Sequence, residues 1–167
     1  MPNPLRRLLL AFALAAVVAG FLAGGAAATL DGPFRIEPRP APKPKPTLGQ
    51  RAARVALKAV GVPYVWGGSS PASGFDCSGL VAWAYRRLSV ELPHSSYSLY
   101  DRGRRVARSR MKPGDLVFFS GLGHVGMYLG QGRMVHAPRS GRNVEIVPLR
   151  GPYYGSRLVG ARRITPA

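Results

Sequence analysis

A run of closely spaced prolines limits what this chain of 167 residues can fold into. Six prolines stand between positions 33 and 46, in the stretch PFRIEPRPAPKPKP. Each proline fixes φ and removes a backbone N–H donor, so neither a helix nor a sheet ladder continues through the run. This composition is typical of an extended polyproline II spacer. We therefore predict a cationic linker over residues 29–46 and one folded domain over residues 47–167. A passive tether is the simpler interpretation of the linker; the alternative is a strip that folds back over the domain and blocks a cleft.

The residues before the linker have the order of a secretory signal peptide. Two arginines at 6–7 precede an uncharged apolar run over residues 8–21, and Ala26 and Ala28 form an A-x-A cleavage motif. The run is short for a span of roughly 20 residues. We predict a leader over residues 1–28, cleavage after Ala28 and an extracytoplasmic protein. The alternative is an uncleaved anchor. No cysteine lies near the cleavage motif, so a lipid attached to a cysteine there is excluded.

The charge balance indicates a polyanionic partner. Lys and Arg outnumber Asp and Glu by 24 to 7, and 18 of those basic residues and 5 of those acids lie in residues 47–167, a net charge of +13. Nucleic acid and an anionic envelope polymer both fit such a charge. Export excludes nucleic acid and favours the envelope polymer, without stable membrane insertion once the leader is removed. The single cysteine excludes an internal disulfide and a cysteine-rich zinc site.

The domain sequence predicts helices first and strands afterwards. A helix fits Leu48–Val60 and stops at Gly61 and Pro63, and a second begins at Cys77 with Asp76 as its N-cap. A Gly/Ser-rich loop lies between them at Gly67–Gly74. Short β-like runs then alternate with Gly-containing turns at Asp115–Ser120, His124–Leu129, Arg133–Ala137, Val144–Leu149 and Arg157–Ile164. This order favours an α+β fold with an antiparallel sheet of about five strands.

Cys77 and two histidines are the candidate chemical groups. A thiol at a helix N-terminus feels the positive end of the helix dipole, so we expect the pKa of Cys77 to be lowered; an inert buried thiol is the alternative. His124 opens one predicted strand and His136 closes the next, twelve residues later. A hairpin of that length would bring the two rings within hydrogen-bonding reach, with His124 as the base and His136 as its orienting partner. His94 has no visible partner and is predicted to be a surface residue.

Three strings carry a family resemblance. PYVWGGSSPASGFDCSGLVAWAY, MKPGDLVFF and GHVGMYLGQGRMVHAP closely resemble the NlpC-type cell-wall endopeptidases of the papain-like superfamily. The resemblance implies a papain-like domain in which Cys77 is the nucleophile, His124 the base and His136 the orienting residue. It also implies that Tyr64 borders the site and that Asp76 and Ser78 receive the free end of a stem peptide. No metal or organic cofactor is implied.

The loop after the nucleophile's helix departs from the family pattern. The family commonly has an Arg-Thr pair followed by a glutamine, whereas this chain reads PHSSYSLY from Pro93 to Tyr100. His94 and Ser95 take the place of the pair, and Leu99 or a neighbour stands where the glutamine is expected. The departure puts the loop's substrate contacts in question and leaves Cys77 and the two histidines untouched.

The leader and the resemblance together predict a secreted cysteine peptidase of the bacterial cell envelope, and we expect it to be a monomer. Its substrate would be the peptidoglycan stem peptide, cleaved between D-glutamate and the following diamino acid through a thioacyl-enzyme. Two alternatives stay open at the sequence level. A thiol-dependent amidase or acyltransferase would use the same three residues, and a non-catalytic module would bind the wall alone.

Overall fold

The structure, a computed structural model, describes residues 41–165. The predicted leader and residues 29–40 of the predicted linker lie outside this range, so both remain predictions. Residues 41–46 are exposed and form no helix or strand. Residues 42–165 lie in one compact unit. No helix in residues 41–165 is long and apolar enough to cross a membrane.

The helices follow the capping signals of the sequence. α1 (Leu48–Leu57) begins with a capping box, in which the Thr47 hydroxyl accepts from the amide of Gln50 and the Gln50 side chain accepts from the amide of Thr47. It ends three residues earlier than predicted, in a turn closed by Gly61 at φ 91°. α2 (Cys77–Arg86) starts at the predicted residue. Three short helical turns complete the set: α3 (Ser96–Tyr100), η1 (Arg108–Arg110) and α4 (Pro152–Gly155).

An antiparallel sheet of six strands carries the second half of the domain. Its order is β3-β8-β4-β5-β6-β7. The strands are β3 (Arg104–Val106), β4 (Leu116–Phe119), β5 (Val125–Gly130), β6 (Arg133–His136), β7 (Glu145–Pro148) and β8 (Leu158–Arg163). A separate two-stranded hairpin, β1 (Ser69–Ser70) with β2 (Gly74–Phe75), lies within the glycine-rich loop.

Five of the six strands match the prediction, and β3 was missed. β3 is only three residues long and begins with two exposed arginines, so it shows no alternation of apolar and polar residues. Its pairing with β8, rather than its own composition, makes it a strand.

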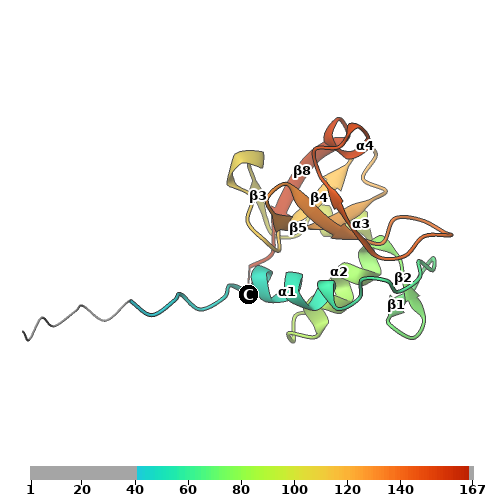
Figure 1. Cartoon of the computed structure of the whole chain (residues 1–167), viewed down its shortest axis with the longest axis horizontal. Helices are drawn as coiled ribbons and strands as arrows, with labels where there is room; N and C mark the ends of the chain where they lie inside the picture. The colour runs from blue at the N-terminus through green and yellow to red at the C-terminus, as the bar shows by residue number, and fades with distance from the viewer. Residues whose placement is uncertain (1–40, 166–167) are drawn as a thin grey trace, which may run out of the picture. The chain divides into compact units, whose positions relative to one another are not determined.

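The two faces of the sheet have different surroundings. Figure 1 shows α1 and α2 together on one side of the sheet, and both pack against β5. The larger core lies between them and includes Leu80, Tyr85, Phe118 and Met127, all buried. A smaller cluster covers the opposite face, with Val106, Phe119, Met134 and Ala161 among its members. α2 is thereby held with its N-terminus at the start of β5.

Close backbone contact fixes where α2 begins. A Cβ added to Gly79 would overlap the carbonyl oxygen of Gly68 in the glycine-rich loop. We predict that Gly79→Ala lowers the free energy of unfolding by about 1–3 kcal/mol, because the loop must move to admit the methyl group. Chemical denaturation measures the change. Gly123→Ala is the matched control, since its Cβ would lie 3.7 Å from the Tyr97 hydroxyl, an ordinary contact. Equal stability of both variants would contradict this account of the contact.

Candidate active site

Asp76 holds the start of α2 in place. Its Oδ1 accepts from the backbone N–H of Gly79 at 2.7 Å, which is the predicted N-cap bond. Its Oδ2 accepts from the backbone N–H of Gly67 at 2.9 Å, so the same carboxylate also ties the glycine-rich loop to the helix. Cys77, the first residue of α2, is therefore positioned by a side chain that is itself buried.

The Cys77 thiol lies against the first residue of β5. The backbone N–H of Val125, the residue that follows His124, is close enough to the sulfur to act on the thiol pKa, which places the thiol near the strand end that carries His124. Burial nevertheless raises the pKa of Cys77, and the charge of Asp76 raises it further. The N–H groups of Val125, Ser78 and Cys77 oppose this change without overcoming it. The expected lowering of the thiol pKa is therefore wrong for this arrangement, because desolvation outweighs the helix N-terminus.

The two predicted histidines meet across the β5–β6 hairpin. His124 Nε2 and His136 Nδ1 are 2.9 Å apart, so the twelve-residue spacing does bring the rings into hydrogen-bonding contact. The rings are nearly perpendicular, with an interplanar angle of 82°. Burial lowers the pKa of His124 to about 4. Burial, and then the neighbouring His124 and Arg142, lower the pKa of His136 to about 3. Both rings are therefore neutral near pH 7.

Two residues that sequence reasoning missed lie on the far side of His136. Its Nε2 is 3.5 Å from the Tyr154 hydroxyl and 3.6 Å from Glu145 Oε1. Glu145 sits directly opposite His136 in the β6–β7 pairing and also bonds the guanidinium of Arg142. The sequence gives no register for β7, so only the structure reveals this carboxylate.

This chain of contacts favours one set of tautomers. A proton on His136 Nε2 faces the Glu145 carboxylate, which leaves His136 Nδ1 as an acceptor. His124 Nε2–H then donates to it, and His124 Nδ1 is left without a proton. An unprotonated ring nitrogen is what a base needs to take the proton of a thiol.

The remaining predicted site residues divide into two kinds. Tyr64 is half-buried, and burial and then the charges of Cys77 and Asp76 raise its pKa. Its place at the border of the site remains a prediction. Asp76 and Ser78 are buried and bonded to each other, Ser78 Oγ donating to Asp76 Oδ1 at 3.2 Å. In the described chain, the hydrogen bonds of the Asp76 and Ser78 side chains join them to other groups of the same chain. A role in receiving substrate remains a prediction.

His94 is exposed as predicted, but the prediction that it has no partner is wrong. Its Nε2 lies 2.8 Å from Asp76 Oδ1, and its side chain is 34% exposed. The loop that departs from the family pattern therefore reaches the N-terminus of α2. The sequence around His94 gives no pattern that would predict its contact with Asp76, eighteen residues earlier in the chain.

Comparison with known proteins identifies the family of this chain. The family model described as NlpC/P60 family matches residues 61–163, more than half of the chain. The chain belongs to the NlpC/P60 family. It is 49% identical over 114 residues to "Probable endopeptidase Rv2190c" of Mycobacterium tuberculosis, covering 65% of this chain and 29% of that protein. It is 42% identical over 127 residues to murein DD-endopeptidase MepH of Escherichia coli, covering 69% of this chain and 47% of that protein.

Solved structures of the family confirm the α+β, papain-like class. An NlpC/P60 protein from Bacillus cereus has a TM-score of 0.67 at 38% identity, with 74% of this chain and 42% of that chain covered. The peptidoglycan hydrolase RipB from Mycobacterium tuberculosis has a TM-score of 0.62 at 34% identity, with 72% and 66% covered. The chain spans less than half the length of the curated relatives named above.

The neutrality of the two histidines is directly measurable. We predict that the ring nitrogens of His124 and His136 keep neutral chemical shifts down to about pH 5, where an ordinary histidine of pKa about 6.5 is mostly protonated. Protonation is favoured in the unfolded chain, so the melting temperature should fall as the pH decreases below about 6.5 toward the folded-state values. The measurement is nitrogen-15 NMR of the His94→Asn variant, in which His124 and His136 are the only histidines left to give signals. A midpoint near pH 6.5 for either ring would contradict their burial as the governing effect.

Proposed function

We propose that this protein is a secreted cysteine peptidase that hydrolyses the stem peptides of peptidoglycan. The observation that carries the proposal is the thiol of Cys77 at the start of α2, near the amide of Val125, which directly follows His124 of the hydrogen-bonded histidine pair. The relatives named as endopeptidases and as a peptidoglycan hydrolase support the substrate class. A wall-binding module without activity has no need of a buried thiol next to paired neutral imidazoles.

The first half of the reaction begins at the thiol. His124 Nδ1 takes the proton of Cys77 as the sulfur attacks the scissile carbonyl carbon. The backbone N–H of Cys77, at the N-terminus of α2, contributes to binding the oxyanion. The protonated His124 then gives its proton to the leaving amine, and the C–N bond breaks to leave a thioacyl-enzyme. Because the thiol pKa is raised, the attack depends on this proton transfer rather than on a thiolate already present at rest.

The second half returns the enzyme to its starting state. His124 removes a proton from water as the oxygen attacks the thioester carbonyl. The C–S bond breaks, the acid product leaves, and the proton passes back to the sulfur. His136 keeps the ring of His124 in the useful tautomer throughout, and Glu145 does the same for His136. Both act as positioning residues.

We place the cleaved bond between D-glutamate and the following diamino acid. Two relatives support this choice by name: gamma-DL-glutamyl hydrolase of Bacillus subtilis, 41% identical over 141 residues, and gamma-D-glutamyl-L-lysine dipeptidyl-peptidase of Bacillus cereus, 42% identical over 113 residues. Tyr64, beside the thiol, would contact the stem peptide, with Asp76 and Ser78 at its free end. MepH is named as a DD-endopeptidase, which makes a bond between two D-centres, as in the cross-link between neighbouring stem peptides, the second candidate.

Product masses separate these candidates. We predict that the protein converts a stem tetrapeptide, L-Ala-γ-D-Glu-diamino acid-D-Ala, into two dipeptides. Cross-linked muropeptides test the DD bond in parallel. Cys77→Ala is the matched control and should yield no product, because no nucleophile remains. Cleavage of only the cross-link would replace the proposed bond by the DD bond, and intact substrate in both assays would contradict the proposed function.

Replacement of His136 distinguishes an orienting residue from a packing residue. We predict that His136→Asn keeps measurable turnover, since the amide oxygen can still accept from His124 Nε2–H. His136→Ala removes that acceptor and should reduce kcat by up to about 10⁴, by analogy with a triad whose orienting residue is altered. Both kcat values are measured beside melting temperatures. If the Ala variant melts and turns over like the parent chain, His136 has no part in the reaction.

A further inference from the structure

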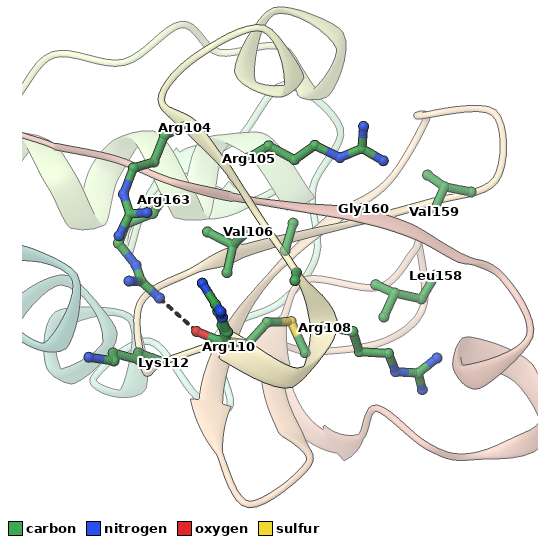
Figure 2. Close-up of a pocket in the computed structure, with 13 residues that line it drawn as sticks. Arg104, Arg105, Val106, Arg108, Arg110, Lys112, Leu158, Val159, Gly160 and Arg163 are labelled. Carbon is green, nitrogen blue, oxygen red and sulfur yellow. Dashed lines mark hydrogen bonds between the residues drawn. The ribbon is translucent and has the colours of Figure 1, made fainter.

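A groove separate from the thiol lies at the β3–β8 edge of the sheet. It has a volume of about 830 Å³, and η1 and residues around it form its other wall. None of Tyr64, Cys77, His124 or His136 lines it. Figure 2 shows several long cationic side chains around it. The basic residues that line the groove are Arg104, Arg105, Arg108, Arg110, Lys112 and Arg163.

Most of this charge has no internal counterion. Arg163 is held by Asp115, whose two oxygens each lie 2.6 Å from a guanidinium nitrogen, and it also donates to the Arg110 carbonyl. Within residues 41–165, no acidic side chain lies within ion-pair distance of the other five basic residues. All five are exposed. Their charges therefore face solvent.

The strand register sets arginine against arginine. Arg104 on β3 is directly opposite Arg163 on β8, and Arg105 is opposite Arg162. Like charges in directly opposed positions destabilise an antiparallel pair. On β8 the two guanidinium groups have local partners, Asp115 for Arg163 and the carbonyl and ring of Tyr100 for Arg162. The β3 arginines have no comparable partner in the described chain, so an external anion would relieve this repulsion.

We propose that this groove binds a linear, base-free phosphodiester polymer of the bacterial envelope, of the polyol phosphate kind. Guanidinium groups match phosphate oxygens in a bidentate fork. Five exposed cations lie between residues 104 and 112, so a ligand with several closely spaced anionic groups would pair with more of them than a single anion would. A polyol phosphate chain carries a charge on every repeat and no amine to offset it, whereas stem peptides carry amines as well as carboxylates.

The lining disfavours the other common polyanions. No aromatic residue lines the groove, and proteins that hold single-stranded nucleic acid stack its bases on aromatic side chains. Its apolar residues Val106 and Ala161 are buried, and Val159 alone among its large apolar side chains is strongly exposed. A concave lining with six basic residues fits a linear polyanion better than it fits a flat bilayer. The proposal concerns binding and is independent of hydrolysis at Cys77.

Binding of the full chain to poly(glycerol phosphate) at several salt concentrations tests the proposal. The triple variant Arg104→Gln/Arg108→Gln/Arg110→Gln should bind at least about tenfold more weakly than the parent chain. The slope of log K against log salt concentration should be smaller in magnitude by up to about 3, roughly one for each lost phosphate contact. The control variant Arg51→Gln/Lys58→Gln/Arg87→Gln removes the same charge from exposed positions outside the groove and should bind like the parent chain. Melting temperatures verify that all three proteins are folded.

Parallel ligands make the choice of partner falsifiable. Poly-γ-glutamate, oligothymidylate and phosphatidylglycerol vesicles test a carboxylate polymer, a nucleic acid and an anionic membrane. The proposal holds if poly(glycerol phosphate) binds most tightly and only the groove variant loses that binding. Equal weakening of both triple variants would show a non-specific effect of net charge and overturn the site. Tighter groove-dependent binding of any of the other three ligands would overturn the assigned partner.

Discussion

Four hydrogen bonds converge on the carboxylate of Asp76, and the geometry around the thiol depends on them. The Ser78 hydroxyl and the Gly79 amide come from α2, the Gly67 amide from the glycine-rich loop, and Nε2 of His94 from the segment before α3. A carboxylate buried without such partners would be strongly unfavourable. With them it caps the helix and complements the positive end of the helix dipole. The position of Cys77 is thus set by a neighbouring carboxylate that already has four hydrogen-bonding partners.

Burial sets the protonation states of the site. The same desolvation raises the pKa of Cys77 and lowers the pKa of His124 and His136, so the neutral forms are favoured on both sides of the reacting pair. In the proposed reaction, charge develops only when a proton moves from the sulfur to the imidazole. The Val125 N–H and the N-terminus of α2 are fixed dipoles already directed at the sulfur, and fixed dipoles need no reorganisation as the charge forms.

Local sequence patterns predicted the helix and strands on or next to which the thiol and the two candidate histidines lie. The contacts of Glu145 and His94 depend instead on long-range packing. The Asp76 cap, the start of α2, five strands and the meeting of His124 with His136 all follow from short motifs or from the length of one hairpin. Glu145 reaches His136 only through the β6–β7 register, and His94 reaches Asp76 only because its loop packs on α2. The direction of the thiol pKa could not be predicted either, because a helix N-terminus is visible in sequence while the depth of burial is not. The assignment of roles to these residues stays a proposal.

The arginines of this strongly cationic domain serve separate purposes according to what faces them. Arg142 bonds Glu145 and contributes to the lowered pKa of His136, so it belongs to the electrostatics of the candidate site. Arg162 and Arg163 are held by Tyr100 and Asp115 and join β8 to its neighbours. The exposed groove arginines are not among the causes of the pKa changes at His124 or His136. Salt screens exposed charges strongly and buried groups much less. The proposed attraction to a polyanion at the β3–β8 edge should therefore vary with salt, whereas the proposed proton transfer at Cys77 should depend on salt much less.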